Sequence, residues 1–176
     1  MRLLARLFSG LLLLAALAVA ALMIWTERAP EPQGEVPGRI TRITVDKSDR
    51  VMVAWDGARE LRRYKVALGF RPVGDKQRQG DGRTPEGRFV IDRKNPNSAF
   101  TLSLGLDYPQ PEDVARGKAG GYDPGGDIMI HGQPNAMPEG MMAAGDWTAG
   151  CIAVPNEAIR EIFAAVEVGT VVEITP

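Results

Sequence analysis

The sequence predicts an α+β protein, mostly β, with one principal helix in its globular part and a membrane helix at the N-terminus. Three observations lead to this fold class. Short runs of apolar and β-branched residues recur between turn signals, as in sheets built from short strands. Only one segment, near the C-terminus, joins a helix start signal to apolar residues at helical spacing. An uncharged run fills most of the first 25 residues.

Residues 1–25 are expected to be a membrane anchor or a signal segment. Arg2 and Arg6 precede an uncharged run of 19 residues, Leu7–Trp25, close to the ~20 that cross a bilayer as a helix. The arginines favour a cytoplasmic N-terminus and place the rest of the chain outside the cytoplasm. A cleavable signal peptide is the alternative, because Ala18-Val19-Ala20 has the small-x-small form of a cleavage site, although apolar residues continue after it.

The remainder divides into a linker and one domain. Residues 26–38 contain three prolines and two glycines with little to bury, which predicts a linker, and residues 39–176 suffice for one core. We interpret the charged run 59–65 as an exposed strand face. The expected helix begins with Asn156 as its N-cap. Its buried face holds Ile159, Ile162, Phe163 and Val166. The other expected strands lie near residues 40–45, 51–55, 64–68, 88–91, 100–106, 127–130, 151–154 and 171–174.

Two residue types that often carry chemistry occur once each in this chain, one cysteine and one histidine. A single cysteine excludes an intramolecular disulfide. One cysteine and one histidine also fall short of the three or four ligands that zinc generally takes from protein, so we expect neither a metal ion nor another cofactor. The formal net charge of −1 provides no broad basic surface, and we therefore do not expect nucleic acid as a partner.

His131 and Cys151 each stand where an apolar strand meets a glycine-rich loop. An adjacent imidazole can take the proton of a thiol, and the resulting thiolate is a competent nucleophile. Gly150, beside the cysteine, lets the backbone approach a substrate and point N–H groups at a developing oxyanion. The pair would therefore suffice for acyl transfer, with Cys151 as nucleophile and His131 as base. An inert buried thiol is the alternative reading. Papain-like hydrolases carry the cysteine before the histidine, the reverse of the order here.

The residues around this pair resemble the catalytic signature of the L,D-transpeptidase (YkuD) family, in which His-Gly precedes a Ser/Thr-x-Gly-Cys segment. Here His131-Gly132 is followed by the run T-A-G-C-I that contains Cys151. The resemblance extends over residues 40–176. Many members carry other residues at Ala149 and Ala153, and the form here is similar to the branch with the murein-lipoprotein-releasing amidase. Further blocks that look like this family are Tyr64–Gly69, Gly80–Gly87 and Asp146–Val154.

The resemblance implies a curved sheet or sandwich of the L,D-transpeptidase type, and an enzyme that acts on peptidoglycan peptide stems. Cys151 would attack the carbonyl of the diamino acid at the third position of a tetrapeptide stem and expel the terminal D-alanine, leaving a thioester. The acyl group would pass to a stem amine, a lipoprotein lysine, a free D-amino acid or water. The partners implied are peptidoglycan stems and, as a candidate, a murein lipoprotein. The location implied is the periplasm, with residues 1–25 in the inner membrane unless they are cleaved.

Several neighbours of the pair are candidate supporting residues. The N–H groups of Gly150 and Cys151 are expected to hold the oxyanion. The resemblance suggests that a backbone carbonyl orients His131, and Gly132 or the loop before Thr148 could supply it. Thr148 could steady the turn at the nucleophile, or it could make an ordinary local hydrogen bond.

Candidate substrate-binding residues are Arg83, Glu86, Arg88 and Trp147. The charged side chains could meet the charged ends of a stem peptide, with a solvated surface as the alternative. Trp147 could line the cleft, or it could pack beside the loop. The loop 133–147 could act as a lid over the cleft or serve as a passive connection.

Two other functions remain open from the sequence, and a third is disfavoured. Hydrolysis in place of transfer, as in an L,D-carboxypeptidase or an amidase that detaches a bound lipoprotein, would use the same residues. An inactive wall-binding protein is suggested by Ala149 and Ala153. A sortase also joins an N-terminal anchor to a histidine before a cysteine, but the Thr-Leu-x-Thr-Cys strand of sortases is not found here.

Overall fold

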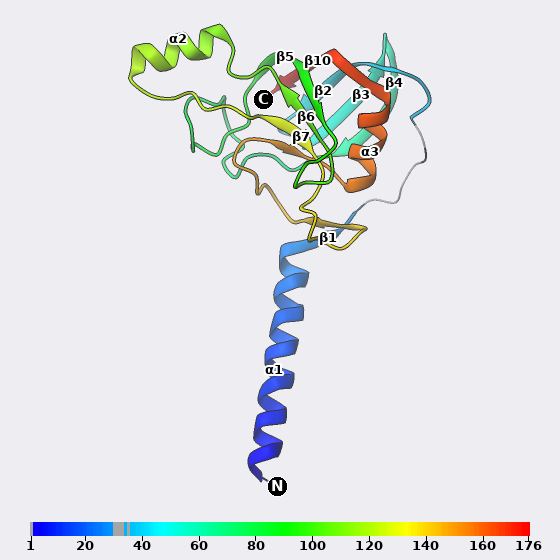
Figure 1. Cartoon of the computed structure of the whole chain (residues 1–176), viewed down its shortest axis with the longest axis vertical. Helices are drawn as coiled ribbons and strands as arrows, with labels where there is room; N and C mark the ends of the chain where they lie inside the picture. Colours follow the sequence, from blue (N-terminus) through cyan, green and yellow to red (C-terminus); the bar gives the residue numbers. More distant parts are fainter. Residues whose placement is uncertain (1, 30–33, 35) are drawn as a thin grey trace.

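The computed structural model describes residues 2–29, 34 and 36–176. In this part of the chain an eight-stranded sheet forms the body of the globular region, in the order β4-β3-β2-β10-β5-β6-β7-β9 (Figure 1). A small second sheet pairs β1 (Thr26–Arg28) with β8 (Met141–Ala143). The strands of the large sheet are β2 (Ile40–Asp46), β3 (Val51–Asp56), β4 (Arg59–Lys65), β5 (Gly87–Asn95), β6 (Ser103–Leu106), β7 (Met129–His131), β9 (Ile152–Ala153) and β10 (Val166–Thr175).

Most neighbouring strands of the large sheet run antiparallel, and β2, β3 and β4 form a meander. Asp46 shapes the turn after β2, because its carboxylate accepts hydrogen bonds from the Ser48 hydroxyl and the Asp49 N–H. Two pairs are parallel: β10 with β2, and β7 with β9. The second parallel pair matters for function, since β7 ends at the single histidine and β9 follows the single cysteine. The prediction of a mostly β fold is confirmed, but the strand expected at 64–68 is β4, which ends at Lys65.

The predicted C-terminal helix is present as α3 (Asn156–Ala165), and its buried face includes Ile159 and Ile162 as expected. The predicted N-cap is wrong. The cap position is Pro155, and the Asn156 side chain turns inward instead. Its amide oxygen accepts hydrogen bonds from the Thr101 hydroxyl at 2.8 Å and the Gln133 N–H at 2.8 Å. The asparagine thus ties the helix start to the segments on either side of the histidine strand.

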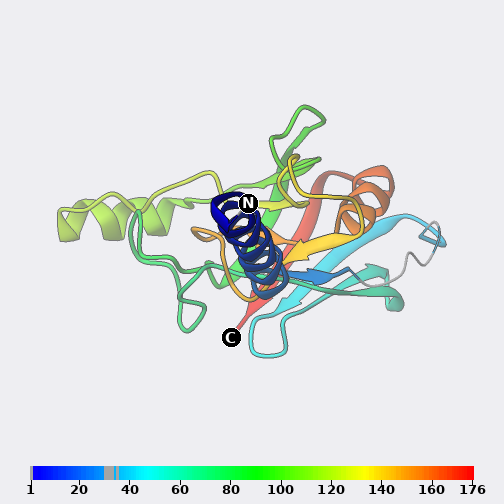
Figure 2. The same ribbon diagram turned by 90° about the horizontal axis from the view of Figure 1, so that it is seen from below.

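A further helix, α2 (Pro111–Gly120), was missed, so the expectation of one principal helix is wrong. Figure 2 shows α2 projecting from one side of the globular part and α3 packed at the other. Gly117 is its one buried residue, so the helix has no apolar stripe to reveal it in the sequence. Local signals hold it: Pro111 at its start, the Asp113 carboxylate accepting from the Gln110 N–H, and Gly121 in the left-handed conformation at its end.

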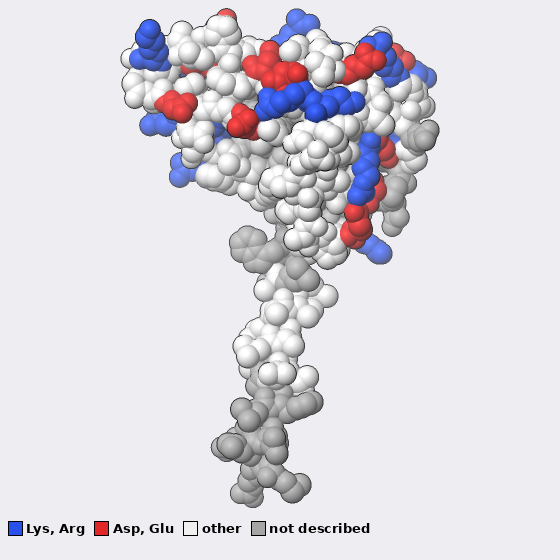
Figure 3. Space-filling model, in the orientation of Figure 1, with Lys and Arg blue, Asp and Glu red and all other residues white. Residues whose placement is uncertain are grey.

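Helix α1 (Arg2–Trp25) extends away from the globular part, and its described side chains carry no charge (Figure 3). Exposed apolar side chains on it include Leu11 and Met23. In the part of the chain that the structure describes, no helix has the combined length and apolarity needed to cross a bilayer, so the predicted membrane anchor is not confirmed. Residues 30–33 and 35 of the predicted linker lie outside the described residues. The linker's first residues form strand β1, which pairs with β8 in the loop 133–147.

Two buried lysines organise the glycine-rich segment 69–87. The Lys47 ammonium, on a residue that is 2% exposed, donates to Gly74 O, Thr84 O and the Glu86 carboxylate at 2.7–3.0 Å. All three of its N–H bonds are therefore used. Lys76, also 2% exposed, pairs with Asp81 at 2.9 Å. These contacts hold a segment without regular secondary structure against the end of the sheet.

The Lys47 cluster leads to a stability prediction. Lys47→Met keeps much of the side-chain volume but leaves the Glu86 carboxylate and two carbonyls without their cation. We expect the free energy of unfolding, measured by urea denaturation, to fall by about 3 kcal/mol. Lys65→Met is the matched control, because Lys65 forms an exposed ion pair with Glu27, and its loss should cost less than about 1 kcal/mol. Equal losses from the two variants would contradict the structural role given to Lys47.

Candidate active site

Strand β7 ends at His131, and β9 begins directly after Cys151, so strand alternation predicts that the two side chains lie on one face of the sheet. Ile130 registers with Ile152, and His131 registers with Ala153. Because alternate residues of a strand face opposite sides, the fully buried isoleucines point into the core and His131 points away from it. Cys151 stands two residues before Ala153, and so on the side of His131. One strand spacing and two residues separate their Cα atoms by about 8 Å, within reach of the two side chains.

The His131 imidazole is held in one orientation. Its Nδ1 lies 2.7 Å from Gly132 O. A carbonyl oxygen only accepts, so Nδ1 carries the proton and Nε2 is left with a free lone pair in the neutral ring. The ring packs against Phe100, with centroids 4.6 Å apart, and edge-on to Trp147 at 5.8 Å. His131 is 4% exposed, and this burial lowers its pKa below the ordinary 6.5, opposed by the hydrogen bond to Gly132.

The Cys151 thiol is neutral at rest. Its Sγ donates to Asp127 O at 3.4 Å, and burial raises its pKa above the ordinary 9.0. The Met129 N–H acts in the opposite direction, since it donates to the sulfur and favours the thiolate. Lys76 also lowers this pKa through its charge, whereas the Asp127 carboxylate raises it. A protonated thiol beside a neutral imidazole is suited to general-base activation.

The turn before the nucleophile is fixed by Thr148. Its hydroxyl donates to Cys151 O at 2.7 Å and accepts from the Gly150 N–H at 3.1 Å. Its backbone pairs with the neighbouring segment, through Leu68 O and the Phe70 N–H. Both sequence readings of Thr148 thus describe the same contacts: the hydrogen bonds are local, and they brace the nucleophile's turn. The Gly150 N–H, expected at the oxyanion, is engaged by this hydroxyl.

Two glycines beside His131 and Cys151 are required by close approaches. A Cβ on Gly132 would lie 2.8 Å from Asn156 Oδ1 and 2.9 Å from an Ile159 methyl group. A Cβ on Gly150 would lie 2.8 Å from Arg83 O, and the φ of +145° at this position is one that side chains rarely adopt. The backbone of Arg83 is therefore in van der Waals contact with the residue that precedes the nucleophile.

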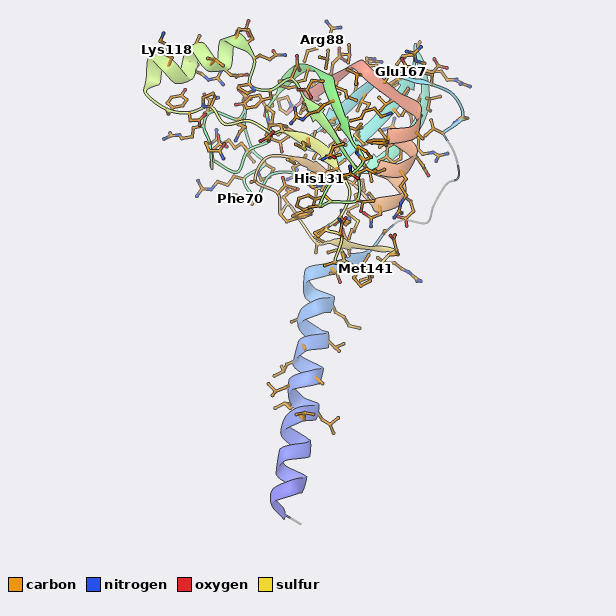
Figure 4. All side chains as sticks on the ribbon, viewed as in Figure 1. Phe70, Arg88, Lys118, His131, Met141 and Glu167 are labelled. Atoms are coloured by element: carbon orange, nitrogen blue, oxygen red, sulfur yellow. The ribbon has the colours of Figure 1, made fainter. Side chains whose placement is uncertain are left out.

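The candidate substrate-binding residues divide by location. The Glu86 carboxylate pairs with buried Lys47, so it neither meets substrate nor lies on a solvated surface, the two roles expected from the sequence. Arg88 is 71% exposed and lies 3.8 Å from Glu173; Figure 4 shows it at the upper edge of the globular part, away from His131. Trp147 packs against both His131 and Phe100, and its buried Nε1 has no hydrogen-bond partner among the described residues. Trp147 and the backbone of Arg83 thus adjoin the candidate pair, whereas Arg88 does not.

The loop 133–147 is held at both ends. The buried Gln133 side chain donates to Val154 O and accepts from the Ala143 N–H. The Asp146 carboxylate accepts from the Leu68 N–H and pairs with Arg50 at 2.9 Å. Strand β8, in the middle of the loop, pairs with β1. A lid role for this loop stays a prediction.

Sequence reasoning missed Phe100, Gln133 and Asn156 as residues of the site. The two polar ones could have been suspected, because buried amides need partners and both adjoin the motif segments. Nothing in the sequence pattern indicated that Phe100 would stack on the imidazole. Among the described residues, no group of three or more His, Cys, Asp and Glu side chains is placed to hold a metal ion.

Solved structures share this fold. Pgp2 of Campylobacter jejuni, described as a helical cell shape determining protein, matches with a TM-score of 0.59 at 24% identity, over 81% of this chain and 50% of its own. Bd1075 of Bdellovibrio bacteriovorus matches with a TM-score of 0.55 at 22% identity, over 86% of this chain and 52% of its own. An L,D-transpeptidase of Xylanimonas cellulosilytica matches with a TM-score of 0.51 at 16% identity, over 83% of this chain and 64% of its own.

Sequence comparison gives the family. One relative is YafK of Escherichia coli K12, which is named as a candidate L,D-transpeptidase. It is 32% identical to this chain over 102 residues, which are 57% of this chain and 35% of YafK. The chain thus spans about a third of that relative. The model of the L,D-transpeptidase catalytic domain (YkuD) matches residues 40–174, and this match includes every strand of the large sheet and both residues of the pair. The chain belongs to the YkuD family of L,D-transpeptidase catalytic domains.

Proposed function

We propose that this protein transfers acyl groups between peptidoglycan peptide stems, with Cys151 as nucleophile and His131 as general base. Membership of the L,D-transpeptidase family supports a role in modifying peptidoglycan. The observation that carries the residue assignment is the hydrogen bond between His131 Nδ1 and Gly132 O. It leaves Nε2 as the proton acceptor on the face of the sheet where Cys151 lies.

The reaction has two halves. His131 Nε2 takes the Sγ proton while the sulfur attacks the carbonyl of the third stem residue. The tetrahedral intermediate then collapses, the C–N bond breaks, and the imidazolium returns its proton to the leaving D-alanine amine. A thioester on Cys151 remains. In the second half His131 deprotonates the incoming amine, which attacks the thioester and regenerates the thiol.

The oxyanion needs a donor in both halves. The Gly150 N–H is engaged by the Thr148 hydroxyl, so we assign the Cys151 N–H as the donor and give Thr148 and Gly150 a positioning role. The Thr148 hydroxyl also donates to Cys151 O at 2.7 Å, which fixes the carbonyl of this residue. The backbone of the nucleophile is thereby oriented before substrate arrives.

The acceptor and the location remain part of the proposal. A stem amine gives a crosslink, water gives carboxypeptidase activity, and a lipoprotein lysine connects the enzyme to a murein lipoprotein. Any of these substrates places the domain in the periplasm. Anchoring through residues 1–25 stays a prediction from the sequence.

The first prediction concerns the catalytic pair. Purified full-length protein is incubated with tetrapeptide stems, with and without an amine acceptor, and the products are identified by mass. We expect loss of D-alanine and a gain of the acceptor's mass. Cys151→Ala should abolish every product, and His131→Ala should lower the rate at least ~100-fold, because the thiol loses its base. Lys118→Ala, on the exposed helix α2, is the control and should be fully active. Full activity of either catalytic variant would refute the assignment.

The second prediction concerns pH. Burial lowers the pKa of His131, so the neutral base persists as the pH falls below 6.5. The rate of acylation should therefore hold until the pH reaches that lowered pKa, and the acidic limb of kcat/KM should lie below 6.5. A preformed thiolate–imidazolium pair would instead raise the pKa of the histidine. An acidic limb at or above 6.5 would count against general-base activation of a neutral thiol.

The third prediction concerns the nucleophile's turn. Thr148→Val keeps the shape of the side chain but removes the hydroxyl that bonds Cys151 O and the Gly150 N–H. We expect the acylation rate to fall by about 10-fold, the scale of one buried hydrogen bond. Thr148→Ser restores the hydroxyl and should recover most of the rate. Thermal unfolding of both variants separates this effect from loss of the fold, and equal rates for Val and Ser would exclude the positioning role.

A further inference from the structure

A cavity of about 430 Å³ lies beside the nucleophile's turn, within the segment 71–83. Its lining includes three arginines, Arg71, Arg78 and Arg83, together with Asp81. We call this cavity the arginine pocket. Its volume is sufficient for part of a peptide side chain with its end group. It is separate from the pair His131 and Cys151, neither of which lines it.

The pocket has an excess of positive charge. In the described part of the chain none of its three arginines forms a salt bridge, whereas most other arginines of the globular part do. Asp81 does not offset them, because its carboxylate already pairs with buried Lys76. Burial raises the pKa of Asp81, but hydrogen bonds from three backbone N–H groups and Lys76 lower it to about 2. Asp81 is therefore ionised and committed to Lys76 and the backbone, and the three arginines line the cavity without an ion-pair partner among the described residues.

The three arginines are held in place to different degrees. The Arg83 guanidinium donates to Asp75 O at 3.2 Å, and Arg78 lies over the Tyr122 ring at 5.8 Å. Arg71 is exposed, and its backbone N–H donates to Gly82 O. The Arg83 guanidinium is thus held by a backbone carbonyl, whereas Arg71 is exposed at the rim. Planar, bidentate guanidinium groups are matched to carboxylates.

The pocket adjoins the nucleophile on the side away from His131. Ala153 pairs with His131 on one side and with Ala67 on the other, so the segment that leads to Arg71 lies across β9 from the histidine. The Phe70 N–H donates to Thr148 O, and Arg83 O contacts Gly150. Figure 4 shows Phe70 and His131 in the same lower region of the globular part. A substrate at Cys151 can therefore reach both the imidazole and the pocket.

We propose that the arginine pocket binds a carboxylate on the acyl-donor part of the stem peptide, the part that stays on Cys151 as the thioester. The inference rests on the proposed function. His131 protonates the leaving amine, so the leaving residue lies on the histidine side and the retained part extends toward the pocket. The formal net charge of the chain is −1, so a general attraction for anions is not expected, and the local cluster supplies the selectivity.

The test compares three tetrapeptides. One has free carboxylates on its second and third residues, one has both of these as carboxamides, and one has only the terminal D-alanine carboxylate amidated. We expect amidation on the acyl-donor part to raise KM about 10- to 100-fold, the scale of a charged hydrogen-bond pair. Terminal amidation should have little effect. A larger effect of terminal amidation would overturn the proposal.

Variants locate the effect in the pocket. Arg71→Gln and Arg83→Gln should each raise KM for the free peptide about 10-fold or more and change it little for the peptide amidated on its acyl-donor part. Arg71→Gln removes an exposed side chain and should not affect folding, which protects the test if Arg83→Gln is unstable. Arg63→Gln, on the exposed face of β4, is the matched control and should behave as the unmodified protein. Equal losses for both peptides would mean that the arginines act only on structure.

A binding measurement separates this inference from the proposed activity. Calorimetry with Cys151→Ala needs no turnover. Tighter binding of the free peptide than of the amidated one, lost on adding Arg71→Gln, would support the pocket even if the unmodified protein released no D-alanine. That combination would refute the proposed transfer alone. Turnover without any discrimination between the peptides would refute the pocket alone.

Discussion

The candidate site depends on the hydrogen bond from His131 Nδ1 to the carbonyl of the next residue, Gly132. No acidic side chain is needed to orient the ring, because the carbonyl itself is fixed: it shares a planar peptide unit with the Gln133 N–H, which donates to Asn156 Oδ1 at 2.8 Å. The absence of a side chain on Gly132 lets the start of α3 pack against it, which brings Asn156 and Ile159 to the histidine strand. One backbone position therefore sets the tautomer of the base and the position of the helix. A larger residue there would disturb both.

Around this bond, the site is supported by buried polar side chains that bridge segments distant in sequence. Asn156 connects α3 to the chain before β6 and after β7, and Gln133 connects β9 to β8. Lys47 does the same for the glycine-rich segment 69–87, whereas Lys76 acts within that segment through Asp81. Each of these groups replaces its lost hydration with several partners, which is the condition under which burying it is tolerated. Irregular loops can then hold a reactive pair with little help from secondary structure.

The sequence was most informative where a residue's type alone determines its environment. β-branched runs predicted the strands, apolar spacing predicted α3, and the single histidine and cysteine, with their glycines, predicted the pair. Prediction failed where partners come from elsewhere in the chain. Helix α2 has cap signals but no apolar stripe. Asn156 is a residue type that often caps helices, but its side chain bonds to Thr101 instead. Glu86 pairs with Lys47, which is 39 residues away in the sequence. Strands β1 and β8 pair only with each other, so neither is recognisable from its own residues.

The energies of the two protonation states explain how such a site avoids indiscriminate reactivity. Moving the proton from a thiol with an ordinary pKa of 9.0 to an imidazole with an ordinary pKa of 6.5 costs about 3 kcal/mol. Burial increases this cost, because it raises the pKa of Cys151 and lowers the pKa of His131. Attraction between the resulting charges returns about 4 kcal/mol at 4 Å and an effective dielectric constant of 20. Because the two terms are of the same size, the groups that a substrate brings decide the balance. Under the proposed function, a carboxylate bound in the arginine pocket would position the carbonyl over the sulfur, and the thiolate would be consumed as it forms.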